Sequence, residues 1–235
     1  GGIEAFARTD EKLFPAKILA PVVPPAIYII GFNYSDDPPG ARKSLGPYPV
    51  IVMKAASTVV ADGDLIEIPG HLSSNEVDYE GELAVVIGRA AKNVSRRDAL
   101  DHVLGYTVAN DLTARDWQRN GAGGQWVRGK NFDTFCPLGP SIVTRDSLDL
   151  ADGIGLRTWV NGELRQEDST GSMVFPVEEL IEFLSGNNTL LPGTVILTGT
   201  PHGTGKQQDR PVYLQSGDVV RVEIDGIGCL TNPVA

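Results

Sequence analysis

The sequence predicts an α+β fold built mainly on one large, mostly antiparallel sheet. Short apolar runs bounded by glycine, proline, asparagine or aspartate outnumber the segments with helical periodicity. The predicted strands do not alternate regularly with helices, and no internal repeat is present. Both observations disfavour parallel barrels and doubly wound sheets, so a strand-rich domain with few short helices remains.

The N-terminal part of the chain is expected to run extended. Residues 1–26 form a lead-in, because four prolines fall between Pro15 and Pro25 and proline neither continues a helix nor donates to a sheet. The first strand is predicted at Ile27–Phe32. Residues 33–49 are polar and rich in proline and glycine, which is typical of a lid or substrate loop or, alternatively, of a plain surface loop. Residues 27–235 are expected to form a single domain.

The remaining elements follow from local patterns. Asn161-Gly162 predicts a tight hairpin turn, because both positions tolerate positive φ. Helices are predicted at Ala99–Val103, after a capping box formed by Ser95 and Asp98, and at Leu112–Arg119 and Val177–Leu184. The other strands are predicted at Val50–Lys54, Leu65–Ile68, Val77–Gly88, Gly105–Asn110, Ser141–Thr144, Leu156–Asn161, Val195–Gly199 and Val219–Ile224.

Composition narrows the function classes. The 235 residues are 41% hydrophobic and carry a formal net charge of −10 without any basic run, which disfavours nucleic acid and anionic membranes as partners. No apolar stretch approaches the roughly 20 residues needed to cross a bilayer. Cys136 and Cys229 form neither a disulfide framework nor a thiolate zinc motif, so a reducing, cytoplasmic setting is expected. A mitochondrial location stays open because the chain begins Gly1-Gly2 without methionine.

Closely spaced acidic residues suggest a metal site. Glu80 and Glu82 open an otherwise apolar strand, and the two-residue repeat of a strand directs both carboxylates to one face. Asp111 follows the predicted strand Gly105–Asn110 directly. Like charges held this close repel one another unless a cation lies between them, and oxygen ligands suit Mg²⁺, Mn²⁺ or Ca²⁺. The alternatives are a solvated strand edge for the glutamates and a helix N-cap for Asp111.

Five segments carry a resemblance to a known family. In chain order, these segments are Gly31-Phe32-Asn33-Tyr34, Val77–Gly88, Gly105–Gln118, Gln125–Pro140 and Leu197–Gly203. From about residue 27 to the end, the sequence resembles the fumarylacetoacetate hydrolase family. The resemblance implies a mixed β-sandwich roll of the type formed by the C-terminal domain of that family. It further implies a homodimer that binds one divalent ion, here Mg²⁺ (or Mn²⁺ or Ca²⁺), and acts on 2-oxo or 1,3-dicarbonyl acids.

The resemblance also implies roles for individual residues. Glu80, Glu82 and Asp111 match the carboxylates that hold the metal. Lys130 matches the lysine that approaches the metal-bound oxygen; the alternatives are a surface ion pair for Lys130 or Arg115 and a turn hydroxyl for Thr200. The substrate-binding positions match Arg115, Gln118, Gln125 and Thr200, the last of which belongs to the motif Thr198-Gly199-Thr200-Pro201.

One departure bears on the reaction. Hydrolytic family members carry a histidine and an acidic partner on the lid, where this sequence has Asp37 and Gly40. A solvated aspartate is a poor general base near neutral pH. His202, inside the substrate-loop motif, is the only histidine predicted to replace that base.

The departure favours enolate chemistry on an oxo acid, either decarboxylation or keto–enol tautomerisation. Hydrolysis of a C–C bond in an acylpyruvate is the alternative, and a catalytically impaired metal-binding module is a further one. A phosphate-binding loop at Gly199–Lys206 is excluded, because five residues separate Gly199 from Gly205 and Gln207 follows Lys206.

Overall fold

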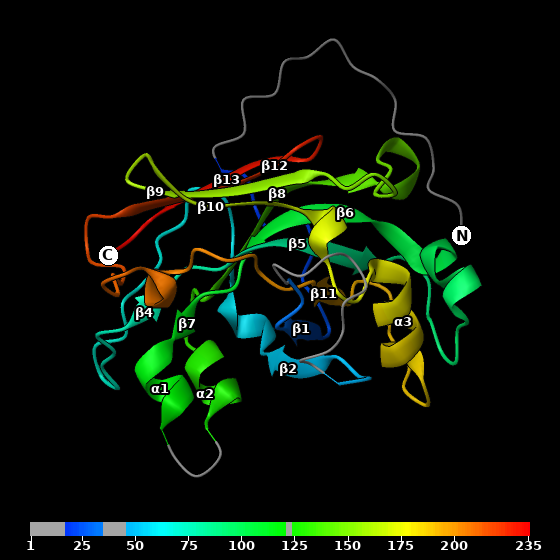
Figure 1. The fold of residues 1–235 in the computed structure, drawn as a ribbon, viewed down its shortest axis with the longest axis horizontal. Helices are drawn as coiled ribbons and strands as arrows, with labels where there is room; N and C mark the ends of the chain where they lie inside the picture. The colour runs from blue at the N-terminus through cyan, green and yellow to red at the C-terminus, as the bar shows by residue number, and fades with distance from the viewer. Residues whose placement is uncertain (1–16, 35–45, 121–123) are drawn as a thin grey trace.

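The computed structural model describes residues 17–34, 46–120 and 124–235, and its main element is a seven-stranded sheet (Figure 1). The strand order is β2-β1-β11-β5-β6-β8-β3. Most pairs are antiparallel, but β1 pairs with β11 and β3 with β8 in parallel, so the sheet is mixed. The strands are β1 (Ile27–Gly31), β2 (Val50–Lys54), β3 (Val59–Val60), β5 (Gly81–Ile87), β6 (Val103–Asn110), β8 (Cys136–Thr144) and β11 (Val195–Leu197).

A second sheet of four strands packs across the first, and Figure 1 shows it along the top of the molecule. Its order is β10-β9-β12-β13, all antiparallel, with bounds β9 (Gly155–Val160), β10 (Glu163–Ser169), β12 (Val219–Ile224) and β13 (Gly228–Pro233). The predicted hairpin is confirmed: Asn161 and Gly162 join β9 to β10 with φ of 53° and 81°. A two-stranded ribbon pairs β4 (Val77–Asp78) with β7 (Thr113–Ala114).

The helices are few and short, as an α+β fold with a dominant sheet predicts. They are α1 (Arg115–Arg119), α2 (Trp126–Lys130) and α3 (Val177–Ser185), with 3₁₀ turns at Ala56–Thr58, Arg96–His102, Arg145–Ser147, Thr170–Ser172 and Gly205–Gln207. Figure 1 shows α1 and α2 near β7 and α3 at the other end of the sheet. None of the helices within the described ranges is long and apolar enough to span a membrane.

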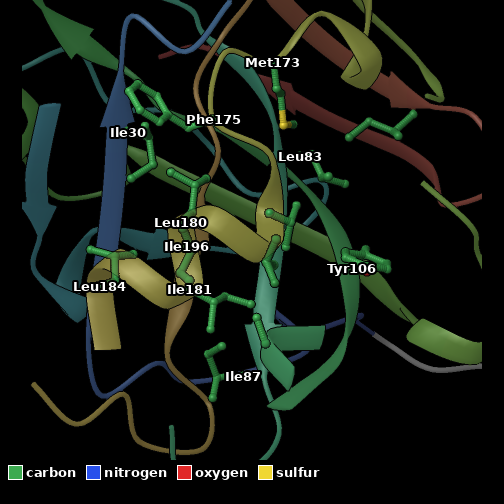
Figure 2. Packing of buried hydrophobic residues seen from close by; sticks show 14 of the residues in the cluster. Ile30, Leu83, Ile87, Tyr106, Met173, Phe175, Leu180, Ile181, Leu184 and Ile196 are labelled. Carbon is green, nitrogen blue, oxygen red and sulfur yellow. The ribbon is translucent and has the colours of Figure 1, made fainter. Parts of the chain in front are cut away.

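The large sheet is buried on both faces, and strand alternation divides its residues between two clusters. Leu83, Val85 and Ile87 of β5 face the cluster that includes α3 and the four-stranded sheet. Figure 2 shows Leu180, Ile181 and Leu184 of α3 packed there with Ile30 and Ile196. The opposite face, here called the inner face, is lined by smaller side chains. Its buried members are Ile27, Ile29, Val52, Ala84, Val86, Ala109, Cys136, Leu138, Val195 and Leu197.

Several predicted boundaries are wrong. The predicted strand Val77–Gly88 is interrupted after Asp78, because Val77–Asp78 pairs with Thr113–Ala114 and not with the strand that follows it. The same pairing shortens the predicted helix Leu112–Arg119 to Arg115–Arg119.

Other differences concern weaker local patterns. The helix predicted at Ala99–Val103 is a 3₁₀ turn without a side-chain cap, and the strand predicted at Leu65–Ile68 is a single bridge from Ile66 to Val234. The strand predicted at Ser141–Thr144 begins earlier, at Cys136. Residues 17–26 contain neither strand nor helix, and most of the predicted lid, residues 35–45, lies outside the described residues.

Candidate metal and substrate site

The three predicted metal carboxylates meet at one end of the inner face. Glu80 precedes β5, Glu82 is its second residue, and Asp111 follows the last residue of the neighbouring strand β6. The register pairs Glu82 with Ala109, and the backbone N–H of Asp111 donates to the carbonyl of Glu80 at 2.8 Å. Residues two apart along a strand lie on the same face of a sheet. Glu82 is two residues from Ala84, and Asp111 is two residues from Ala109, so both side chains project to the inner face. The carboxylate oxygens lie within 4.8 Å of one another.

Buried cations neutralise two of these carboxylates. Arg115 Nη2 donates to Glu80 Oε1 at 2.6 Å, and Lys130 Nζ donates to Glu80 Oε2 at 2.8 Å and to Asp111 Oδ2. Burial alone would raise the pKa of Glu80, but the charges of Arg115 and Lys130 outweigh it and hold the pKa well below the usual range. Burial would likewise lower the pKa of Lys130, yet Asp111 and Glu80 raise it, so the side chain is an ammonium ion.

Glu82 differs from its neighbours because it has no cationic partner among the described residues. Glu82 Oε2 accepts a hydrogen bond from the backbone N–H of Gly199 at 2.7 Å. Burial, followed by the charges of Asp111 and Glu80, raises the pKa of Glu82 well above its usual range. Within this network, Glu82 is therefore the carboxylate whose ionisation requires a further positive charge.

This donor set fits a hard divalent cation. All three groups supply only oxygen, are at least nine-tenths buried and converge on one point. Asp111 Oδ1 forms a buried ion pair with Lys54 Nζ at 2.8 Å but accepts no hydrogen bond from the described residues. A carboxylate oxygen without a hydrogen bond, beside a carboxyl of raised pKa, is an arrangement that a Mg²⁺-sized ion would stabilise.

The binding of Mg²⁺ is expected to depend on pH. Glu82 must lose its proton to act as a ligand, and its raised pKa keeps that proton in place at low pH. The increase in melting temperature produced by saturating Mg²⁺ should therefore grow as the pH rises from about 5 to about 8. Thermal unfolding with and without Mg²⁺ at each pH measures this increase. An increase of the same size at every pH would contradict the expectation.

A cavity of about 130 Å³ opens onto Glu80 and Glu82 and is lined by most of the predicted substrate residues. Arg115 lines the cavity, but its guanidinium also hydrogen-bonds to other side chains. Nε donates to Asp78 Oδ2 at 2.8 Å, and Nη1 donates to Gln118 Oε1 at 3.3 Å. Arg115 therefore anchors Glu80 in addition to facing the substrate. Six other residues with predicted roles line the same cavity: Glu80, Glu82, Gln118, Lys130, Thr200 and His202.

The remaining predicted site residues differ in their placement. The Thr200 hydroxyl donates to the Gly81 carbonyl at 2.9 Å and accepts from Gln166 Nε2 at 2.8 Å, so it also fixes its loop to β5. His202 is exposed and lines the cavity. Gln125 is exposed at the N-terminal end of α2 and is absent from the cavity wall. Asp37 and Gly40, where the lid base was expected, lie outside the described residues.

Three buried residues that sequence reasoning missed complete the network. Lys54 is the last residue of β2 and lies two residues after Val52, so its side chain points to the inner face. There its ammonium donates to the carbonyls of Leu112 and Lys130 at 2.9 and 2.6 Å. Asp78 accepts from Arg115, and Thr113 Oγ1 accepts from Lys130 Nζ at 2.9 Å. A lysine at an inward position of an apolar strand, and an Asp78-x-Glu80-x-Glu82 spacing, are the sequence features that could have revealed the first two.

The chain is similar in sequence and fold to several known proteins. The model of the family described as fumarylacetoacetate (FAA) hydrolase C-terminal matches residues 26–235. The chain is 50% identical over 218 residues to oxaloacetate tautomerase fahd2, mitochondrial, of Xenopus laevis, covering 92% of this chain and 68% of that protein. It is 42% identical over 227 residues to oxaloacetate tautomerase YisK of Bacillus subtilis (strain 168), covering 95% and 74%. Among solved structures, a fumarylacetoacetate hydrolase from Exiguobacterium antarcticum superposes with a TM-score of 0.85 at 44% identity, covering 92% and 77%.

Proposed function

Because this chain belongs to the fumarylacetoacetate hydrolase family, we propose that it is a divalent-metal-dependent enzyme that interconverts the keto and enol forms of oxaloacetate. The observation that carries the proposal is that Glu80, Glu82 and Lys130 line one cavity and that a carboxylate oxygen of buried Asp111 lies within 4.8 Å of those of the two glutamates. The chain that carries them is 50% identical to an oxaloacetate tautomerase. This is the enolate chemistry expected from the sequence, with oxaloacetate as the substrate.

The three carboxylates would hold the ion, and a bound divalent cation would supply Lewis acidity to the keto group of the substrate. Lys130 is positioned to stabilise the negative charge that develops on the substrate oxygen when the enolate forms. Its raised pKa keeps it protonated, so it acts as an electrostatic stabiliser and not as a base. Arg115 keeps Glu80 ionised and oriented through its 2.6 Å contact.

Substrate orientation is assigned to the polar groups of the cavity wall. Arg115 donates to Gln118 Oε1, so the amide nitrogen of Gln118 is the atom that can donate to a substrate carboxylate. Thr200, together with its loop, would help to orient the same substrate carboxylate. For Gln125, which lies off the cavity wall, the substrate role remains a prediction.

Proton transfer at the substrate carbon is assigned to His202, which lines the cavity and is the only histidine among its lining residues in the described parts of the chain. Replacing His202 with alanine should lower kcat for enol–keto exchange by about 10²-fold while leaving Mg²⁺ affinity unchanged. Loss of Mg²⁺ affinity in the variant would argue instead for a structural role of the loop.

Two assays test the proposed function against its alternatives. With Mg²⁺ present, oxaloacetate is followed for enol–keto exchange and for release of carbon dioxide, and acetylpyruvate for release of acetate and pyruvate. The proposal expects enol–keto exchange to be the fastest of these reactions. Faster hydrolysis of acetylpyruvate would establish a C–C hydrolase, and saturable binding without any product would establish a binding module.

We also propose that the protein is a homodimer. An obligate dimer of this kind should bury more than roughly 1,000 Å². Sedimentation at micromolar concentration is expected to give twice the chain mass of 25.1 kDa. A species of the mass of one chain would refute the dimer.

The remaining expectations are the choice of Mg²⁺ among divalent ions, residues 27–235 as the catalytic domain, and a cytoplasmic or mitochondrial location. Metal analysis of protein purified without added ions tests the first expectation, and limited proteolysis tests the second. Fractionation of cells that make the protein tests the third.

A further inference from the structure

Among the described residues, one cation at the cavity forms no ion pair with a carboxylate. Arg115, Lys130 and Lys206 are the lysine and arginine residues that line the cavity within the described parts of the chain. Arg115 is bound to Asp78 and Glu80, and Lys130 to Glu80 and Asp111. Lys206 makes no ion pair in the described residues, and its side chain is exposed at the cavity. It is therefore the cation that remains available to an anionic ligand.

The backbone that carries Lys206 is fixed to the metal site. Asp78, which is fully buried, accepts from the N–H groups of Gly205 at 2.6 Å and Lys206 at 3.1 Å, and from Arg115 Nε at 2.8 Å. A Cβ at position 205 would lie 2.1 Å from the carbonyl oxygen of Val212, so only glycine permits this close approach. The loop thus holds Lys206 at a set position relative to Arg115 and Glu80.

The charges of the site require such a cation. Oxaloacetate carries two carboxylates, and only one of them can join the keto oxygen at the metal end of the cavity. The other must lie in a cavity that is also lined by Glu80, Glu82 and Asp168, in a protein of net charge −10. Partial desolvation at the cavity, followed by the positive charge of Arg115, lowers the pKa of Lys206, although the charges of Glu80 and Asp78 act in the opposite direction.

We propose that Lys206 binds the distal carboxylate of the substrate and makes the site selective for dicarboxylic 2-oxo acids over monocarboxylic ones. The inference rests on the proposed function, because it assumes that the carboxylate and keto oxygen of a 2-oxo acid face Glu80, Glu82 and Asp111. Lys206 is then a specificity-determining residue that contacts the end of the substrate farthest from the metal carboxylates. Its ammonium would form a charge-assisted hydrogen bond in a partly enclosed cavity.

The test compares two four-carbon acids that differ only at the distal group. Oxaloacetate ends in a carboxylate and 2-oxobutyrate in a methyl group. Trp126 lines the cavity, so its fluorescence after rapid mixing with the Mg²⁺-loaded protein reports binding whether or not turnover occurs. Lys206→Met should raise the Kd of oxaloacetate about tenfold and change that of 2-oxobutyrate less than about twofold. Lys206→Arg should retain the preference for oxaloacetate.

Lys92→Met, at an exposed lysine that does not line the cavity, is the matched control and should bind both acids like the wild type. Equal changes of Kd for the two acids in Lys206→Met, or no change for either, would overturn the inference. Failure of the proposed function looks different: the wild type would bind oxaloacetate with the Lys206-dependent preference but would not accelerate its enol–keto exchange.

Discussion

Replacing Lys54 with methionine is expected to lower the free energy of unfolding by about 3 kcal/mol. Methionine fills a similar volume, so packing against the inner face should be largely preserved. The substitution removes the donor that reaches the carbonyls of Leu112 and Lys130, and it removes a positive charge 2.8 Å from Asp111 Oδ1. All of these groups are in a part of the molecule from which water is excluded, so water cannot replace the lost interactions.

Denaturant unfolding of the metal-free protein measures this loss. Lys92→Met is the control: its side chain is exposed, and its effect should stay within about 0.5 kcal/mol. Adding Asp111→Asn to Lys54→Met tests the mechanism, because removing the anion as well should recover part of the lost stability. A Lys54→Met protein as stable as the wild type would mean that the ammonium contributes nothing net to the buried network.

The sequence predicted the strands best where their identity depends on local pattern. The apolar run of β5 and the Asn161-Gly162 turn are specified by residues that are neighbours in the chain, and both were found. The break after Asp78 could not be found in this way, because it depends on pairing with Thr113–Ala114, some 35 residues later. The helical pattern that begins at Leu112 was overridden by the same pairing.

The candidate site divides in the same way. The alternation of a predicted strand indicated that Glu80 and Glu82 lie together, and their carboxylates do meet, although β5 begins only at Gly81. The position of Asp111 at a strand end suggested a third ligand. Nothing local connected Lys54 to Asp111, because β1 and β11 separate β2 from the strands that carry the acids. The resemblance to the family supplied Lys130 and Arg115, but it did not indicate that Arg115 is engaged by Asp78 and Glu80.

Metal binding and turnover should be lost in both Glu82→Gln and Glu80→Gln. Without metal, however, Glu82→Gln should be more stable than the wild type and Glu80→Gln less stable. Each substitution removes one ligand oxygen charge, so calorimetry should detect no Mg²⁺ binding at millimolar concentration. The rate of enol–keto exchange should fall at least about 10³-fold, because enolate formation loses the Lewis acid. Circular dichroism is the structural control: both variants should give the spectrum of the wild type, which would show that the sheets are retained.

The contrast in stability follows from the partners of the two glutamates. At any pH above the usual pKa of a glutamate, Glu82 is ionised in the unfolded chain. In the folded protein, burial and two neighbouring carboxylates disfavour its ionisation. Its replacement should therefore stabilise the metal-free protein by about 1 kcal/mol or more at pH 7, and by less as the pH falls toward 4.

Glu80 is the opposite case, because its pKa is lowered by Arg115 and Lys130. Glu80→Gln leaves those buried cations without their anion and should destabilise the metal-free protein by about 3 kcal/mol. Denaturant unfolding at pH 5 and pH 8 distinguishes the two variants, and a loss of stability in Glu82→Gln comparable to that in Glu80→Gln would show that Glu82 is held by a partner other than a metal ion.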